Sequence, residues 1–180
     1  VRDGCLSFSS FYDETAHGRT SDAEFALLTS LHPAPGGSAF FLHGDNQFRT
    51  LAAVFREHGY STLFAHPHDR GFWNRYAVYA GFGFDHLLFK EDFVPGRMIG
   101  WGLADGDFFE QSVRRLERLP RPFFALLVTL TDHHPFQDLP IPAAELPLGP
   151  LEGTLLGRYL KVCREKDRAL ELLVRRMSRS

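Results

Sequence analysis

The sequence predicts an α/β fold in which a mostly parallel sheet is flanked by helices. Two apolar runs of strand length, residues 60–65 and 122–130, alternate with segments whose apolar residues recur at helical spacing. This alternation is typical of a parallel sheet, because neighbouring parallel strands are usually joined by a helix. With 180 residues, of which 44% are hydrophobic and 23% charged, the chain has the make-up of one globular domain over residues 1–180.

The first element expected is a helix. Polar residues 20–24 precede Phe25 and Leu28, which share a helical face, so the helix should begin at Thr20 or within two residues of it. Residues 33–37 are proline, alanine and glycine, and this stretch ends the helix.

The remaining elements follow from the same kind of pattern. Gly59 is placed to end a second helix, and Pro120 to end a later amphipathic one. The expected order is a helix over 48–58, a strand over 60–65, a short helical or irregular piece at 71–76, a turn into a brief strand at 81–85, a helix over 103–119, a strand over 122–130, a proline-rich surface loop over 135–150 and a long helix over 151–177.

Charge and cysteine content exclude several classes of protein. The 20 basic and 22 acidic side chains nearly cancel, so the broad cationic face of a nucleic-acid binder is missing. Cys5 and Cys163 stand alone, which excludes a disulfide scaffold and a cysteine-based zinc knuckle. The longest apolar run, residues 123–130 apart from Thr129, is far shorter than a membrane helix. No basic-then-apolar leader opens the sequence, so either export is absent or the true N-terminus lies upstream, and we favour the second interpretation.

Histidines follow both predicted strands. His66 and His68 come after the first, and His133 and His134 after the second. Because the carboxyl ends of parallel strands meet at one edge of the sheet, we expect His66 and His133 at the same edge as Thr20. A threonine hydroxyl at a helix start suits a nucleophile that attacks phosphorus, although a plain N-cap is the ordinary interpretation.

Trp73 offers a flat apolar indole ring, and Arg75 offers a planar guanidinium group. The guanidinium matches the geometry of phosphate or sulfate oxygens. The alternative is a structural tryptophan beside a surface arginine. His133 could donate to an oxyanion or help to protonate a leaving group, or it could be satisfied by Asp132.

Taken in order, these motifs resemble the lipoteichoic acid synthase and phosphoglycerol transferase branch of the sulfatase-like alkaline phosphatase superfamily. The resemblance covers nearly the whole chain. Its motifs are Gly-Arg-Thr-Ser-Asp-Ala-Glu-Phe at 18–25, His66 with Phe-Trp-Asn-Arg at 72–75, Gly-Phe-Gly-Phe-Asp at 81–85, Gly-Trp-Gly-Leu-Ala-Asp at 100–105 and Thr-Leu-Thr-Asp-His-His-Pro-Phe at 129–136.

The resemblance implies a role for each matching residue. Thr20 matches the nucleophile, which in the family also ligates a divalent metal, usually Mn²⁺, and carries glycerol phosphate covalently. His66, Trp73, Arg75 and His133 match the pocket for glycerol phosphate. The donor would be a glycerophospholipid or another phosphoglycerol donor, and the acceptor a glycan or lipid. The site would lie in the cell envelope, on the extracytoplasmic face, with membrane association only through segments outside this chain and no nucleic-acid partner.

The sequence also departs from the family pattern. Pro67 and His68 follow the first pocket histidine, where the family often has glycine and a small polar residue. The family's metal-binding glutamate, upstream of the nucleophile, and its Asp-His pair, downstream, have no match here. We therefore interpret the chain as the central part of a catalytic domain. We expect it alone to bind divalent metal poorly, to be inactive and to leave apolar sheet edges open.

Three alternatives remain. A sulfuric ester hydrolase of the same superfamily is disfavoured, because Thr20 stands where those enzymes convert a Cys or Ser. A non-catalytic relic or anion-binding module would keep Arg75, His66 and His133 without metal. A metallohydrolase with histidine ligands would draw on the two histidine pairs together with Asp69 and Asp132.

Overall fold

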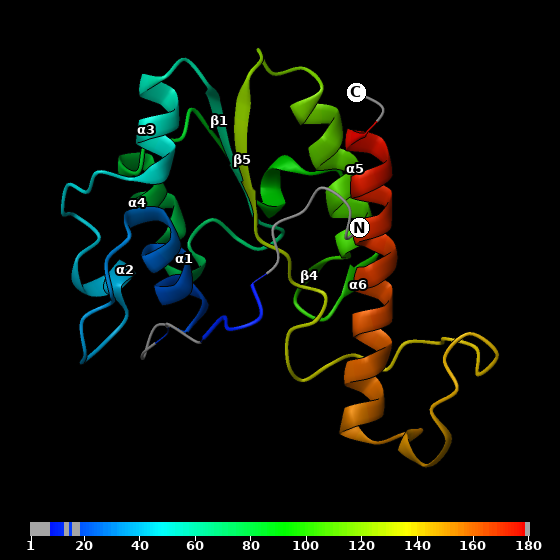
Figure 1. Cartoon of the computed structure of the whole chain (residues 1–180). Coiled ribbons are helices and arrows are strands. Elements are labelled where there is room, and N and C mark those ends of the chain that lie inside the picture. The colour runs from blue at the N-terminus through cyan, green and yellow to red at the C-terminus, as the bar shows by residue number, and fades with distance from the viewer. Residues whose placement is uncertain (1–7, 13–14, 16–18, 179–180) are drawn as a thin grey trace.

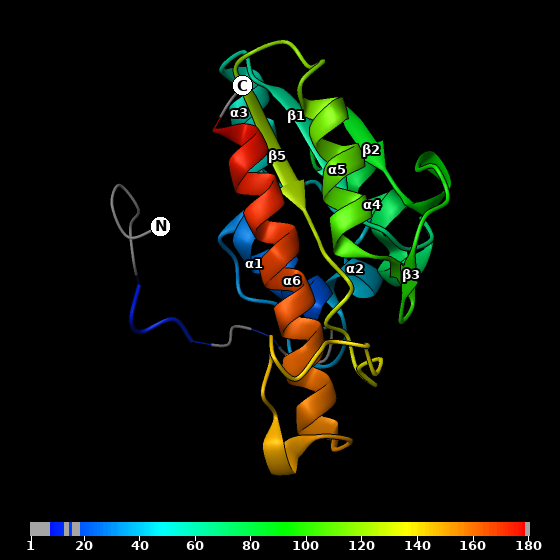
Figure 2. The ribbon, with the colours of Figure 1, turned by 90° about the vertical axis from the view of Figure 1, so that its right-hand side faces the viewer.

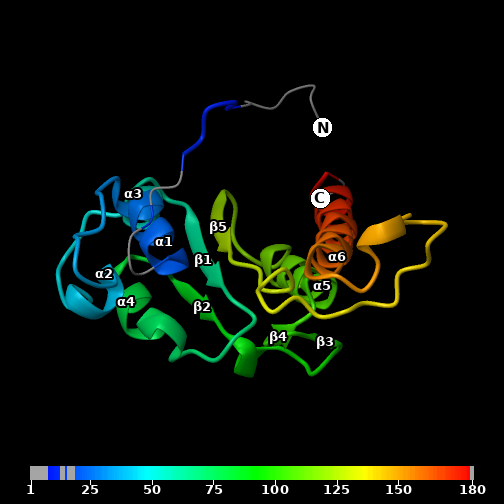
Figure 3. The ribbon, with the colours of Figure 1, turned by 90° about the horizontal axis from the view of Figure 1, so that it is seen from below.

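The computed structural model describes residues 8–12, 15 and 19–178, so Cys5, Gly18 of the first motif and Arg179 lie outside it. A central sheet separates two layers of helices, as Figures 1 and 3 show. This confirms the predicted α/β class. The helices and strands are α1 (Thr20–Thr29), α2 (Ala39–Leu42), α3 (Leu51–Glu57), β1 (Ser61–Ala65), α4 (Arg75–Gly81), β2 (His86–Leu88), β3 (Met98–Ile99), β4 (Gly102–Leu103), α5 (Asp105–Leu116), β5 (Phe123–Leu127) and α6 (Leu155–Met177), with short 3₁₀ turns at Phe72–Asn74, Lys90–Asp92 and Gly149–Leu151.

The main sheet has the order β2-β1-β5, and all three strands are parallel. Ser61 lies opposite Phe123 and Ala65 opposite Leu127, which confirms that the two apolar runs are adjacent parallel strands. The strand expected to reach residue 130 ends at Leu127. Its partner β1 stops at Ala65, and the Val128 N–H makes the last bond across, to the Ala65 carbonyl.

Alternate residues of the strands face opposite helical layers, as the pleat requires. Phe64, Phe124 and Leu126 pack with α1 to α4 in a core rich in aromatic rings. Leu63 and Ala125 pack with α5 and α6 on the other face. In Figure 2 the long helix α6 runs along this second face, and its first turns extend beyond the sheet.

Some elements differ from the sequence prediction. Leu103 belongs to the small antiparallel pair β3-β4, so the expected helix over 103–119 begins only at Asp105. Phe48 precedes α3, whose N-cap is Thr50. The last helix begins at Leu155 because the Thr154 hydroxyl caps it by accepting from the Gly157 N–H. The short α2, β3 and β4 were not expected.

Within the part of the chain that the structure describes, β5 pairs with a neighbour on one side only. Its other edge lies between α1 and α6, and the cavity there is lined by strand residues Leu126 and Leu127. This agrees with the expected open sheet edge. None of the described helices is long and apolar enough to cross a bilayer.

Candidate active site

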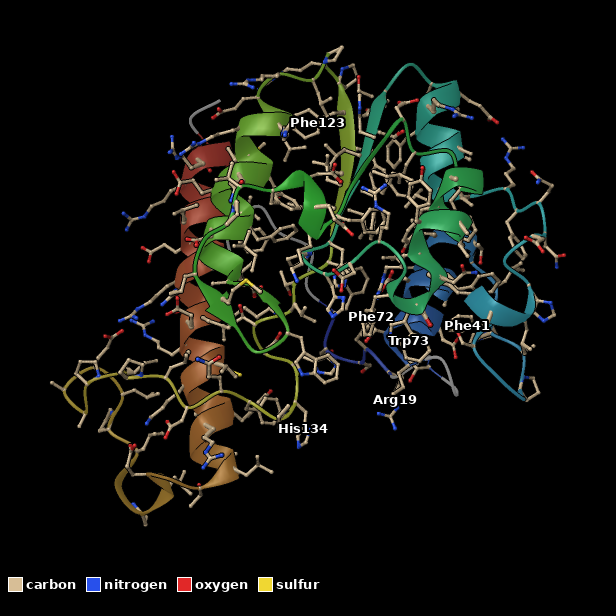
Figure 4. All side chains as sticks on the ribbon, turned by 180° about the vertical axis from the view of Figure 1, so that it is seen from behind. Arg19, Phe41, Phe72, Trp73, Phe123 and His134 are labelled. Atoms are coloured by element: carbon tan, nitrogen blue, oxygen red, sulfur yellow. The ribbon has the colours of Figure 1, made fainter. Side chains whose placement is uncertain are left out.

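The predicted site residues gather at the edge of the sheet where the parallel strands end. Figure 4 shows this edge: Arg19, Phe72, Trp73 and His134 lie there, whereas Phe123, which starts β5, lies at the opposite end of the molecule. A cavity of about 530 Å³ opens at this edge between α1, β5 and the start of the following loop. Thr20 and His133 both line it, which confirms that they share an edge. Its wall also holds Glu24 and the ion pair of Lys166 on α6 with Asp132.

Thr20 is the first residue of α1, and the N-cap position belongs to Arg19. The interpretation of Thr20 as a plain N-cap is therefore wrong. Its side chain is exposed on the cavity wall, where the N-terminal end of the ten-residue helix favours negative charge. A hydroxyl in this place suits attack on an anionic phosphorus centre.

His66 directly follows β1 and is 1% exposed. Its Nδ1 lies 2.9 Å from the carbonyl oxygen of Val128, a residue of the cavity wall. Since a carbonyl only accepts, Nδ1 carries the proton. Burial first, and the charge of Arg75 second, lower the pKa of His66 from 6.5 to about 3, so the ring is neutral. Its buried Nε2 has no hydrogen-bond partner in the described structure and is therefore a free acceptor.

The low pKa of His66 predicts an acid-sensitive fold. Below pH 6.5 the unfolded chain binds a proton at this ring, and the folded chain does so only near pH 3. The free energy of unfolding should therefore decrease as the pH is lowered through this window, by up to about 1.4 kcal/mol per pH unit and by about 2 kcal/mol from pH 6.5 to 4.5. Urea unfolding of the wild type and His66→Gln at several pH values measures the difference. Equal pH dependence in both would contradict it.

Arg75, the first residue of α4, is only 1% exposed. The alternative of a surface arginine is therefore wrong. Its Nε and Nη2 donate to the two carboxylate oxygens of Glu24 at 3.0 and 2.5 Å, and its Nη1 donates to the Phe72 carbonyl at 3.4 Å. The hydroxyl of Tyr79 donates to Glu24 Oε2 as well. Glu24 lines the cavity, whereas Arg75 lies behind this carboxylate and does not itself line the cavity.

Trp73 lies to one side of the cavity. Its backbone is left-handed, with φ 56°, which for a bulky residue costs about 1–3 kcal/mol and occurs mostly at functional sites. The indole ring lies 5.9 Å from Phe41 and 6.2 Å from Phe72. From Phe72 the aromatic contacts continue to Trp101 and then to His133, whose ring centre is 4.2 Å from that of Trp101. These ring contacts connect Trp73 to His133 across the site.

Asp105 holds the loop that carries His133. It is buried at the start of α5, and its Oδ1 accepts the N–H groups of Leu130 and Thr131, each at 3.1 Å. Its own N–H donates to the Thr131 hydroxyl at 2.9 Å. Burial raises the pKa of Asp105, and these hydrogen bonds oppose the rise. Sequence reasoning found the 100–105 motif but assigned no role to Asp105 or Trp101.

The other polar residues at this edge are already paired. His133 Nδ1 lies 2.7 Å from the His134 carbonyl, and Asp132 binds Lys166 at 2.7 Å, so Asp132 does not satisfy His133 as one alternative supposed. Asp69 lies 3.9 Å from Lys90. Nowhere in residues 8–12, 15 and 19–178 do three His, Cys, Asp or Glu side chains converge as metal ligands would. The alternative of a metallohydrolase built on the two histidine pairs is therefore not supported.

Comparison with known proteins agrees with the motifs. A family model described as Sulfatase matches residues 1–177. The chain belongs to the sulfatase family. It is 37% identical over 175 residues to a lipoteichoic acid synthase-like protein of Bacillus subtilis, across 95% of this chain and 28% of that protein. It is 34% identical over 171 residues to a lipoteichoic acid synthase of Staphylococcus aureus, across 91% of this chain and 26% of that protein.

Solved structures show the same fold. The lipoteichoic acid synthase LtaP from Listeria monocytogenes superimposes with a TM-score of 0.85 at 23% identity, over 94% of this chain and 42% of that one. The Streptococcus pyogenes phosphoglycerol transferase GacH, solved with sn-glycerol-1-phosphate, superimposes with a TM-score of 0.65 at 20% identity, over 89% and 44%. This sulfatase-family chain thus lies in the lipoteichoic acid synthase branch of the alkaline phosphatase superfamily, and spans about a quarter of its curated relatives' length.

Proposed function

We propose that this sulfatase-family chain is the central part of the catalytic domain of a phosphoglycerol transferase of the cell envelope, with Thr20 as its nucleophile. One observation carries the proposal: Thr20, at a helix N-terminus, and His133, after a parallel strand, line one cavity. The relatives' names, lipoteichoic acid synthase and phosphoglycerol transferase, support it. The donor is a glycerophospholipid or another phosphoglycerol donor, the acceptor is a glycan or lipid, and the site faces the extracytoplasmic side.

In the proposed reaction, the Thr20 hydroxyl oxygen forms a bond to the donor's phosphorus as the bond from phosphorus to the donor's alcohol oxygen breaks. The exposed Thr20 hydroxyl loses its proton to solvent, and His133 gives the proton on its Nε2 to the departing alcohol oxygen, because its Nδ1 is held by the His134 carbonyl. In the second step the acceptor oxygen bonds to phosphorus as the bond from phosphorus to Thr20 breaks; His133 takes back a proton from the acceptor hydroxyl, and the Thr20 oxygen takes one from solvent.

The family resemblance implies a role for each remaining residue, although His66 and Arg75 are each 1% exposed and do not line the cavity, so a ligand reaches them only when the cavity wall moves. His66 then accepts a hydrogen bond at Nε2 from a glycerol hydroxyl, because its Nδ1 donates its proton to the Val128 carbonyl. Arg75 binds the phosphate with the N–H groups that Glu24 and Phe72 leave free. Trp73 packs on the glycerol carbons with the exposed side of its ring.

The divalent metal that the family resemblance implies, Mn²⁺, has no complete ligand set among the described residues. Thr20 offers one hydroxyl oxygen, and the two carboxylates that line the same cavity, Glu24 and Asp132, are bound to Arg75 and Lys166. The residues present do not fit a metal site, and we derive no step through the metal. An incomplete ligand set is expected both of the central part of a catalytic domain and of the second candidate, a non-catalytic anion-binding module, so it does not separate the two.

A transfer assay distinguishes the two. The protein for this assay contains these 180 residues and has the full length of the relatives. Incubated with Mn²⁺ and a fluorescent glycerophospholipid, it should release diacylglycerol and transfer glycerol phosphate to the acceptor. The 180-residue chain in the same assay should release none, and calorimetry should show no micromolar binding of Mn²⁺. Absence of release by the longer protein would leave the anion-binding module. Turnover by the short chain would mean that its own residues supply the missing ligands, with His66, His68 and His133 the first to mutate.

A further inference from the structure

Glu24 is a charged residue buried in the middle of the site, and the roles proposed above do not use it. It is 5% exposed and lies one helical turn after Thr20 on α1, and both residues line the same cavity. Residues four apart share a helix face, so the position of one fixes that of the other. The arginine bound to Glu24 comes from α4, 51 residues later in the chain. The Glu24 carboxylate therefore links α1, which carries the proposed nucleophile Thr20, to Arg75, which is proposed to bind the phosphate.

We propose that Glu24 is a positioning residue that holds the Arg75 guanidinium in the orientation that binds the substrate phosphate. This rests on the proposed function. Glu24 accepts from Nε and Nη2, the two donors along one side of the guanidinium, at 3.0 and 2.5 Å. The Phe72 carbonyl takes one N–H of Nη1. An arginine has five N–H donors, so one on each terminal nitrogen is left for a ligand.

The carboxylate is fixed from its own side. The Tyr79 hydroxyl donates to Oε2, and Tyr79 is fully buried in the core of the α1 to α4 layer. Desolvation and the nearby Glu24 carboxylate raise the pKa of Tyr79 well above its usual value, so its hydroxyl stays a donor at any physiological pH. Three donors bind the two carboxylate oxygens of Glu24 and hold this side chain in place. Glu24 therefore does not leave the Arg75 guanidinium when a ligand binds.

Orientation and charge predict opposite effects when Glu24 is neutralised, and this makes the proposal testable. Removing a negative charge beside Arg75 would, by Coulomb attraction alone, tighten the binding of an anion. Losing the acceptor that orients the fork would weaken it. Glu24→Gln keeps the shape and one acceptor oxygen but removes the charge. We expect it to bind sn-glycerol-1-phosphate about tenfold more weakly, despite the more favourable charge balance.

The experiment is calorimetric titration of sn-glycerol-1-phosphate into the purified 180-residue chain and its variants, at matched folded fraction by circular dichroism. Lys161→Met is the control. Lys161 is 6% exposed on α6 and binds the exposed carboxylates of Asp138 and Glu152 at 2.8 and 2.5 Å, so it is an ion-paired residue outside the cavity. It should bind like the wild type. Equal or tighter binding by Glu24→Gln, or an equal loss in Lys161→Met, would overturn the positioning role.

A second measurement decides the case in which the wild type itself does not bind. The Arg75 Nε–H proton, followed by nitrogen-15 NMR without ligand, should exchange slowly in the wild type and at least tenfold faster in Glu24→Gln. No binding by the wild type, with this contrast present, contradicts phosphate binding by this chain but keeps the orientation of Arg75 by Glu24. Equal exchange in both proteins overturns the positioning role, whatever the ligand does.

Discussion

Thr20→Ala is expected to abolish phosphoglycerol transfer, by about three orders of magnitude or more, in a protein of the relatives' full length that carries this chain. The substitution removes the hydroxyl that forms the covalent intermediate in the proposed reaction, at the first position of α1. The helix itself should persist, because its N-cap is Arg19 and Thr20 provides no cap. Release of diacylglycerol from a labelled glycerophospholipid, followed over time, measures the loss.

The matched control is Thr20→Ser, which keeps the hydroxyl and removes one exposed methyl group. It should retain a measurable fraction of the wild-type rate and form the same covalent intermediate, visible by mass spectrometry as glycerol phosphate on residue 20. Thr20→Ala with an unchanged rate would show that Thr20 is an exposed helix residue without a catalytic role. Thr20→Ser as inactive as Thr20→Ala would indicate that the loss comes from altered shape of the cavity.

The sequence predicts the parts of the fold that local patterns determine. The strands β1 and β5 are continuous apolar runs because both faces of the sheet are covered, and a chain this short has few ways to place two such runs except side by side. Once they are parallel, the loops after them must share an edge. For this reason the placement of His66 and His133 at one edge of the sheet could be predicted before any coordinates were known.

Other features depend on contacts between distant residues and could not be predicted. Nothing near Glu24 in the sequence indicates that its partner is Arg75, because the pair forms only when α4 packs on α1. The one local signal is a carboxylate four residues after Thr20 on a helix that is otherwise apolar on that face. Trp73 is similar: its left-handed backbone contradicts the preference of a bulky residue, so only tertiary structure can impose it. The two-residue strands β3 and β4 are too short to show a period.

Arg75→Ala is expected to lower the free energy of unfolding by about 3–5 kcal/mol, because it leaves the Glu24 carboxylate buried without its counter-charge. Loss of a charged hydrogen bond to the substrate phosphate would by itself weaken binding by about 1.5–3 kcal/mol. The buried ion pair adds a larger effect on folding. Urea unfolding of Arg75→Ala and of the wild type at the same pH measures it directly.

Glu24→Gln combined with Arg75→Met separates folding from binding. Both side chains of the pair are then neutral, so no buried charge is left without a partner. Most of the stability should return, since neutral replacement of a buried ion pair is often close to harmless. Tyr79 can still donate to the amide oxygen that replaces the carboxylate. Binding of sn-glycerol-1-phosphate should stay lost, because the guanidinium is absent. If instead Arg75→Ala unfolds at the same urea concentration as the wild type, Glu24 must be solvated or protonated without its partner, and the ion pair contributes little to the fold.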